Sequence, residues 1–243
     1  MRLLTFSVRN LKEIIRDPLN LAFLFGFPLV LLLLLSAIQA SIPVSLFEIA
    51  HLSPGIAVFG LAFMTLFSAT LIAKDRQSSL MHRLYTTPMR PVDFILGYTL
   101  PLLPIALAEG VVTYLVAAFL GLKITGGVLL SLVLMLPIAL LYIGIGLLCG
   151  SILNDKQVGG ICGALLTNLS AWLSGIWFDL DLVGGAFKQV AYALPFVHAV
   201  EMERAAVAGN FADVFSHLWW VLGYAIAAIT LAVWLFLRQM KRQ

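Results

Sequence analysis

The chain has 243 residues, of which 61% are hydrophobic and 11% are charged, and its mean hydropathy is +1.02. Soluble globular domains carry about 25% charged residues, so this composition excludes that class and indicates a protein whose outer surface faces lipid. The formal net charge of +3 is small and the basic residues are not clustered, which argues against a nucleic-acid partner.

The first segment, Arg2–Arg16, is predicted to form an amphipathic helix. Its apolar residues recur at helical spacing and make one stripe, which consists of Leu4, Val8, Leu11 and Ile15. Asp17 and Pro18 then turn the chain into the first apolar run, because the residue before a proline avoids helical geometry. We interpret residues 1–18 as an elbow that lies on the inner membrane surface. The alternative is a plain positively charged anchor.

Six apolar runs are long enough to cross a bilayer, which takes about 20 residues of helix. They are Leu19–Ala40, Ser53–Ala73, Val92–Leu120, Val128–Leu153, Val158–Phe178 and Leu218–Leu237. Pro101 and Pro104 predict a kink in the third run, and Pro137 predicts one in the fourth. The sequence therefore predicts an all-α membrane protein with six transmembrane helices in one domain, residues 1–243.

The placement of lysine and arginine predicts the orientation of these runs. All but three of the 15 basic residues fall on one side of the predicted membrane. The other side holds Lys123, Lys188 and Arg204. Since basic residues accumulate on the cytoplasmic side, both termini are predicted to be cytoplasmic, as an even number of spans requires.

A polar island, residues 74–91, separates the second and third apolar runs. Its apolar residues lie at helical spacing and form one stripe, which consists of Leu80, Met81, Leu84 and Tyr85. Arg76 and Arg83 supply a polar side, Asp75 stands near the start, and Pro88 ends the helix. We interpret the island as a cytoplasmic helix that docks a soluble partner. The alternative is a solvated loop whose basic residues only fix the orientation.

A second connecting segment, Asp179–Ser216, is long for a loop, and loops of this length are usually functional or disordered. It is too apolar for disorder, and its pattern predicts two short helices separated at Pro195. The second helix, Phe196–Ala208, carries Glu201, Glu203 and Arg204. Neither helix is long enough to span, so we expect both to dip into the outer leaflet and return.

Three residues inside or beside the apolar runs are candidates for a substrate path: Glu109, Asn168 and Trp172. Glu109 is the one carboxylate deep in a run, where a charge is costly. Three roles are open to it: a proton or cation site, part of the substrate path, or a protonated structural donor. Asn168 has the alternative role of linking helices, and Trp172 that of anchoring at the lipid interface.

Several kinds of catalytic motif are absent from the sequence. It contains neither a phosphate-binding Gly-x-x-x-x-Gly-Lys-Ser/Thr loop nor a His-Glu-x-x-His zinc helix, so we expect no bound nucleotide and no metal site. An intramembrane serine protease of the rhomboid kind is the enzyme alternative. Trp172 stands where the first glycine of its Gly-x-Ser-Gly motif belongs, and His198 and His217 are not in mid-span, which disfavours it.

Three ordered elements resemble the membrane permeases of type-2 ABC exporters, the family of drug, antibiotic, polysaccharide and lipid export permeases. The first is Arg16-Asp17-Pro18, and the second extends from Lys74 through Leu80-Met81-His82-Arg83-Leu84 and Thr87-Pro88 to Phe94-Ile95-Leu96-Gly97. The third is Ser174-Gly175-Ile176-Trp177-Phe178, followed by Pro195, Val200-Glu201 and Arg204. The resemblance covers essentially the whole chain in length, topology and motif order.

The resemblance implies a six-span half-transporter in a prokaryotic cytoplasmic membrane. The elbow, a coupling helix in residues 74–91 and two re-entrant helices in residues 179–216 are its expected features. It also implies pairing with a second permease, as a homodimer or heterodimer, and docking to a separate ABC ATPase subunit. ATP and Mg would then be held by that partner, with no cofactor and no catalysis on this chain. The implied ATPase-coupling residues are Asp75, Arg76, Leu80, Met81, Arg83, Leu84, Tyr85 and Pro88, and the outer-helix candidates are Pro195, Glu201 and Arg204.

The expected cargo is a hydrophobic or amphipathic small molecule, such as a drug, an antibiotic or a lipid-like compound, because the runs are apolar and hold a single deep carboxylate. A polysaccharide or glycolipid export permease is one alternative, although such a path is expected to need more aromatic and polar residues. A subunit that senses or confers immunity to an antibiotic peptide is the other alternative.

Overall fold

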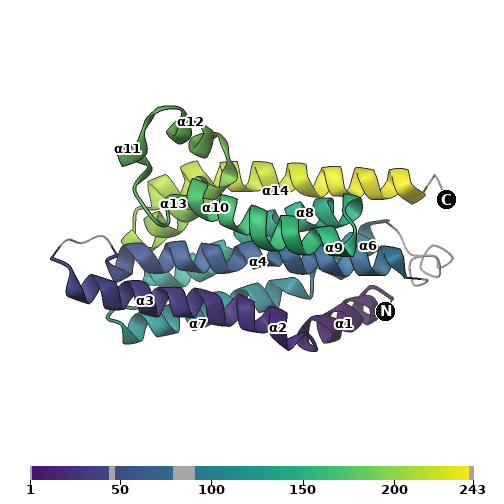
Figure 1. Cartoon of the computed structure of the whole chain (residues 1–243), viewed down its shortest axis with the longest axis horizontal. Helices are drawn as coiled ribbons and strands as arrows, with labels where there is room; N and C mark the ends of the chain where they lie inside the picture. The colour runs from purple at the N-terminus through teal and green to yellow at the C-terminus, as the bar shows by residue number, and fades with distance from the viewer. Residues whose placement is uncertain (1, 44–46, 79–90, 241–243) are drawn as a thin grey trace.

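The computed structural model describes residues 2–43, 47–78 and 91–240, and every regular element in these ranges is a helix. The helices run mostly along one axis, and the two chain termini lie at the same end of the bundle (Figure 1). In chain order they are α1 (Arg2–Ile15), α2 (Pro18–Leu21), the π-helix η1 (Ala22–Gly26), α3 (Phe27–Ser41), α4 (Ile49–Gln77), α6 (Pro91–Thr99), α7 (Leu102–Phe119), α8 (Gly126–Ile152), α9 (Asp155–Val158), the π-helix η2 (Gly159–Leu166), α10 (Thr167–Leu173), α11 (Leu180–Val183), α12 (Gly185–Ala193), α13 (Pro195–Ala208) and α14 (Phe211–Met240).

Five stretches of helix in the described residues are long and apolar enough to cross a membrane. They are Pro18–Ser41, Ile49–Gln77, Val92–Phe119, Gly126–Ile152 and Phe211–Arg238. These confirm five of the six predicted spans and an all-helical fold. The third of them is interrupted between Thr99 and Leu102, where Pro101 stands, as its prolines predict.

The remaining predicted span, Val158–Phe178, is not among these five stretches. The chain there is helical through α9, η2 and α10, but α10 ends at Leu173. Gly175 then adopts a left-handed backbone with a φ of 72°, which only glycine adopts without strain. The helical stretch also begins with the charged residues Asp155 and Lys156. It is therefore shorter and more polar than the predicted span.

Helix α4 is the centre of the bundle. Almost every residue from Leu52 to Ala73 is buried, on all sides of the helix. Its neighbours are α8, α7, α13, α3 and η2, of which α8 makes the most extensive contact. A transmembrane helix that is apolar all round is expected to be enclosed by other helices or lipid, and α4 is enclosed by protein.

The contact between α4 and α8 is close because two glycines of α8 lie one turn apart on the side that faces α4. A Cβ atom at Gly146 would lie 2.4 Å from the carbonyl oxygen of Thr65, and one at Gly150 would lie 2.6 Å from that of Ala69. Thr65 Oγ1 donates a hydrogen bond of 3.0 Å to the carbonyl of Tyr142 in α8. Small residues at four-residue spacing allow two membrane helices to approach to backbone contact.

We expect Gly146→Ala to lower the free energy of unfolding by about 1–3 kcal/mol, the usual cost of overpacking, because backbone atoms of α4 cannot rotate away from the added methyl group. Gly223→Ala is the matched control, since a Cβ at Gly223 of α14 meets no atom within 4 Å. Thermal midpoints of the detergent-solubilised proteins measure the difference. Equal midpoints for the two variants would contradict the close α4–α8 contact.

The helices predicted in the N-terminal segment and in Asp179–Ser216 are present as helices, whereas the helix predicted in the polar island lies outside the described residues. Arg2–Arg16 corresponds to α1, and Phe196–Ala208 to α13, with α11 and α12 before it. Helices α11 and α12 project sideways from the bundle, in the half that lies away from the termini (Figure 1). Their insertion into the outer leaflet, and the position of α1 on the inner membrane surface, stay predictions.

Candidate functional site

The polar island predicted to bind a partner begins with a buried carboxylate, Asp75, near the end of α4. Arg9 of α1 forms a bidentate ion pair with Asp75, with Nη1–Oδ2 and Nη2–Oδ1 distances of 2.7 and 2.8 Å. Tyr98 of α6 donates a third hydrogen bond of 2.8 Å to Oδ2. The Asp75 side chain is 3% exposed, whereas that of Arg9 is 38% exposed. Bidentate hydrogen bonds between charged groups are strong and fix the geometry of both partners.

Helix α1 also contacts α6, the helix that follows the polar island in the chain. Asn10 Nδ2 donates a hydrogen bond of 2.9 Å to the carbonyl of Gly97. The ring of Phe6 lies against the same glycine, where a Cβ atom would be 2.2 Å from it. We call the group Arg9, Asn10, Asp75, Gly97 and Tyr98 the α1 junction. It joins α1 to the last turns of α4 and to α6, the two helices that flank residues 79–90.

Two of the predicted ATPase-coupling residues lie among the described residues, where Asp75 is buried and Arg76 is partly buried. Asp75 belongs to the α1 junction, and Arg76 Nη1 donates to the carbonyls of Gly150 and Leu153 at the end of α8, at 2.9 and 3.4 Å. Both side chains therefore contact neighbouring helices of this chain. The other predicted coupling residues lie outside the described residues; they are Leu80, Met81, Arg83, Leu84, Tyr85 and Pro88.

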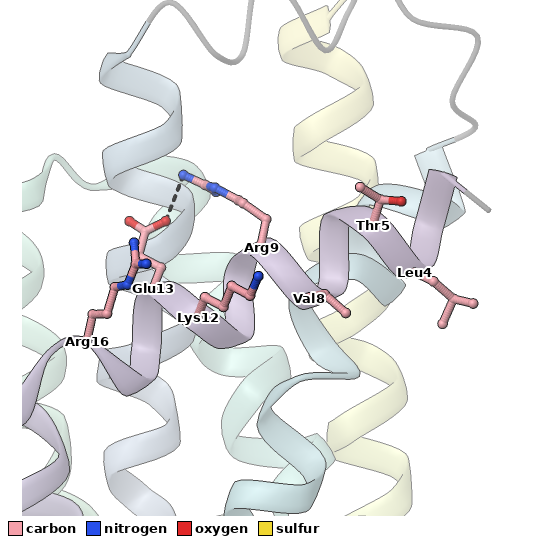
Figure 2. Close-up of a pocket in the computed structure, with 7 residues that line it drawn as sticks. All are labelled: Leu4, Thr5, Val8, Arg9, Lys12, Glu13 and Arg16. Carbon is pink, nitrogen blue, oxygen red and sulfur yellow. Dashed lines mark ion pairs between the residues drawn. The ribbon is translucent and has the colours of Figure 1, made fainter.

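The outward side of α1 carries both apolar and basic side chains. Figure 2 shows them projecting from this one helix, with Arg9 paired to Glu13 at 2.7 Å. Leu4 and Val8 are 65% and 47% exposed. The predicted apolar stripe is thus mostly exposed, while the opposite face, which includes Phe6 and Asn10, packs on the bundle. A hollow lined by a single helix does not enclose a ligand, so we describe it as a surface and not as a binding cavity.

Glu109 is enclosed in the centre of the bundle. It belongs to α7, is 1% exposed, and accepts a hydrogen bond of 3.0 Å from Thr113 one turn later. Gly60 of α4 leaves the space that its carboxyl group occupies, since a Cβ atom there would lie 2.1 Å from Oε1. The other carboxyl oxygen, Oε2, is buried without a hydrogen-bond partner in the described structure.

The other two candidates for a substrate path face outward. Asn168 is exposed and donates to the carbonyl of Ala164 in its own helical stretch, at 2.8 Å. Trp172 is 54% exposed, and its ring lies 5.7 Å from that of Phe178. The structure therefore does not bring these two residues together with the enclosed Glu109.

A further buried carboxyl group, Glu203 of α13, was not singled out by the sequence as a functional candidate. It is fully buried and contacts Tyr114 of α7 and Ser131 of α8. The available signal was the helical spacing of its apolar neighbours, since Ala199, Val200 and Ala206 share its buried face of α13. The sequence pattern of Glu201, Glu203 and Arg204 resembles a solvated face, and this masked the signal.

The outer-helix candidates hold α13 in place. Pro195 is buried at the first turn of α13, where its fixed backbone angle suits a helix start. Arg204 pairs with Glu201 at 2.8 Å and donates to the carbonyl of Gly175 at 3.0 Å. It also donates to the carbonyl of His51, in the first turns of α4, at 3.3 Å. Arg204 therefore ties α13 to α4 and to the turn after α10.

Two histidines connect α13 to α14. The Nδ1 atoms of His198 and His217 are 2.9 Å apart, and His198 Nε2 lies 3.0 Å from the carbonyl oxygen of Tyr192. A carbonyl only accepts, so Nε2 of His198 carries a hydrogen, and the Nδ1 of neutral His198 accepts from His217. Burial is the largest cause that lowers the pKa of His198.

This pKa shift predicts a loss of stability in acid. Because the folded protein holds His198 neutral, the unfolded chain binds an additional proton below the ordinary pKa of 6.5. The contribution of His198 to stability is therefore complete above about pH 6.5 and falls as the pH is lowered further. We expect the thermal midpoint of the native chain, relative to that of His198→Gln at the same pH, to fall over this range. Parallel pH profiles for the two proteins would contradict the prediction.

Comparison with protein families gives one match. The family model described as ABC-2 type transporter matches residues 1–207. The matched region contains the α1 junction, the buried carboxyl groups of Glu109 and Glu203, and all but the last residue of α13. No curated protein matches the chain.

Proposed function

The chain belongs to the ABC-2 type transporter family as its membrane-spanning, non-catalytic permease subunit, and on this premise we propose that it exports a hydrophobic or amphipathic compound. The family implies an ATPase partner. In our proposal that partner is a separate ABC ATPase subunit, which holds ATP and Mg and docks on residues 74–91. Its closure upon ATP binding drives the permease between inward-facing and outward-facing states.

The observation that carries the proposal is the α1 junction. Asp75 lies at the start of the predicted docking segment, residues 74–91, and Tyr98 follows this segment. Arg9 and Asn10 of α1 hold the two helices on which Asp75 and Tyr98 lie. A force applied between α4 and α6 is then transmitted to both helices together, because their polar contacts with α1 are directional and buried. Rigid helices joined in this way move as a body, as a transporter switch requires.

The exposed side of α1 supports the predicted elbow and the cytoplasmic position of both termini. Leu4 and Val8 are exposed beside the basic residues Lys12 and Arg16 (Figure 2). A helix with exposed apolar and basic side chains suits the boundary between lipid and water, with its charges toward anionic headgroups. In our proposal α1 lies on the inner surface of a prokaryotic cytoplasmic membrane, and α12 and α13 are the re-entrant helices of the outer leaflet.

A second permease completes the proposed transporter. In the first span, Pro18–Ser41, 17% of the residues of an 18-residue apolar stretch are buried within this chain, and in the last, Phe211–Arg238, 28% are buried. Both spans therefore leave wide apolar surfaces for lipid or for a second copy. We propose that residues 1–243 form one domain and that the cargo path lies between two such domains. The apolar spans favour a hydrophobic or amphipathic cargo over a polysaccharide, whose path is expected to carry more polar and aromatic side chains.

The test is purification of the tagged chain from its native membrane in mild detergent. We expect an ABC ATPase to co-purify, and vesicles that contain both proteins to move a fluorescent amphipathic compound only when ATP is hydrolysed. Transport that continues without ATP, or turnover of a substrate by this chain alone, would overturn the proposal.

A further inference from the structure

Three side-chain oxygens from three helices meet in the interior of the bundle. They are Oε2 of Glu203 in α13, the hydroxyl of Tyr114 in α7 and the hydroxyl of Ser131 in α8. Each forms a hydrogen bond with both of the others, and Tyr114 lies 2.9 Å from Glu203. The exposed fractions are 2% for Tyr114 and 0% for the other two residues. The group is closed to solvent and joins α13 to two membrane-spanning helices.

The number of hydrogens in this group depends on the charge of Glu203. Three contacts among three oxygens require three hydrogens, and the hydroxyl groups of Tyr114 and Ser131 supply two. A neutral Glu203 supplies the third, so that each oxygen donates once and accepts once. If Glu203 is ionised, one of the three oxygen–oxygen contacts has no hydrogen. The carboxylate charge also has no cation beside it, since the ion pairs of the described residues do not include Glu203. A buried charge without a partner is costly.

The other ionisable groups around α13 do not offset such a charge. Glu109 of α7 interacts electrostatically with Glu203 and is itself acidic. Glu109 Oε2 and Glu203 Oε1 are both buried without hydrogen-bond partners in the described structure. His198 contacts His217 and the carbonyl of Tyr192. Arg204 contacts Glu201 and the carbonyl of Gly175. The surroundings therefore favour the neutral carboxyl group.

We propose that Glu203, with Tyr114 and Ser131, is a proton-binding site that holds α13 against α7 and α8 while it is occupied. When α13 separates from these helices, the proton passes from the carboxyl group of Glu203 to water, and the carboxylate is left hydrated. The bound ligand is one proton and the partner in exchange is the aqueous phase. The inference depends on neither the cargo nor the ATPase.

The direction of the pH effect follows from linkage. Burial raises the pKa of Glu203 to about 8, and the hydrogen bonds with Ser131 and Tyr114 oppose this rise. The docked state thus binds the proton more tightly than a hydrated carboxyl group, whose ordinary pKa is 4.5. Docking of α13 is strongest below that ordinary value. It weakens about tenfold for each pH unit above it and levels off beyond about pH 8.

Hydrogen–deuterium exchange of the full chain in lipid nanodiscs tests the proposal. After correction for the intrinsic pH dependence of exchange, the equilibrium constant for opening of α13 should increase about tenfold per pH unit between about pH 6.5 and 8. The contribution of His198 is constant in this range, which lies above its ordinary pKa of 6.5. In Glu203→Gln the opening should not depend on pH, because the amide keeps a donor and an acceptor but does not ionise.

Glu201→Gln is the matched control, because Glu201 is a partly exposed carboxylate on the same helix. It should retain the wild-type pH dependence. A slope that persists in Glu203→Gln, or the absence of a slope in the native chain, would overturn the proposal. Infrared titration of the native chain gives a second test that needs no variant. The proposal requires a protonated carboxyl band that is lost as the pH rises through about 8, and it is wrong if no carboxyl group titrates there.

Discussion

Arg9→Ala is expected to lower the free energy of unfolding by about 3 kcal/mol and to weaken the coupling of ATP hydrolysis to transport. The substitution leaves the Asp75 carboxylate, 3% exposed, with the hydroxyl of Tyr98 in place of a cation. Removing one partner of a buried ion pair costs about 3–5 kcal/mol. The lower end applies because Arg9 is itself 38% exposed.

A double-mutant cycle separates this charge effect from a simple loss of packing. Asp75→Asn in the Arg9→Ala background removes the charge that was left without a partner, so the double variant should be more stable than the additive sum of the single variants. Lys12→Ala is the control on the exposed side of α1 and should lie within about 0.5 kcal/mol of the native chain. Chemical denaturation in detergent measures the four proteins of the cycle and the Lys12→Ala control.

The coupling part of the prediction needs a second measurement. Arg9→Ala should still bind the ATPase, because the predicted docking residues are unchanged, but it should move fewer cargo molecules per ATP hydrolysed. The α1 junction would then have a mechanical role. Equal transport per ATP in Arg9→Ala and in the native chain would assign the junction to stability alone.

The sequence predicts the helices of this protein well, because apolar runs of about 20 residues have few alternatives in a membrane. It does not predict the role of Asp75. This residue stands at the start of a polar island, and only the family resemblance implied a role for it, as an ATPase-coupling residue. Its partner, Arg9, lies 66 positions earlier in the chain, and only the packing of α1 on α4 and α6 brings the two together.

The buried carboxyl groups of Glu109 and Glu203 show the same limit. Glu109 could be singled out from the sequence, because it interrupts a long apolar run. Glu203 could not, because its neighbours Glu201 and Arg204 are polar and its helix, α13, is too short to span. Its burial depends on the position of α13 among α4, α8 and α14, which no local pattern encodes. Periodicity indicates which face of a helix is apolar, but not which neighbours cover a polar residue on that face.

Leu84→Asp is expected to abolish docking of the ATPase and therefore ATP-dependent transport, while the chain remains folded and inserted. Leu84 lies outside the described residues, and the prediction depends on the apolar stripe of the polar island. A charge placed in the centre of an apolar interface typically costs about 2 kcal/mol or more, which weakens binding about 30-fold. Co-purification of the ATPase and transport in vesicles measure the two effects.

Leu84→Met is the matched control, since it keeps an apolar side chain of similar volume and should retain docking and transport. Together with Arg9→Ala, these variants distinguish two steps that a transport assay alone combines. Leu84→Asp should lose the bound ATPase, whereas Arg9→Ala should keep it and transmit its movement poorly. If Leu84→Asp keeps full ATPase binding and full transport, the polar island is not the docking helix, and the α1 junction would transmit a force that enters the permease elsewhere.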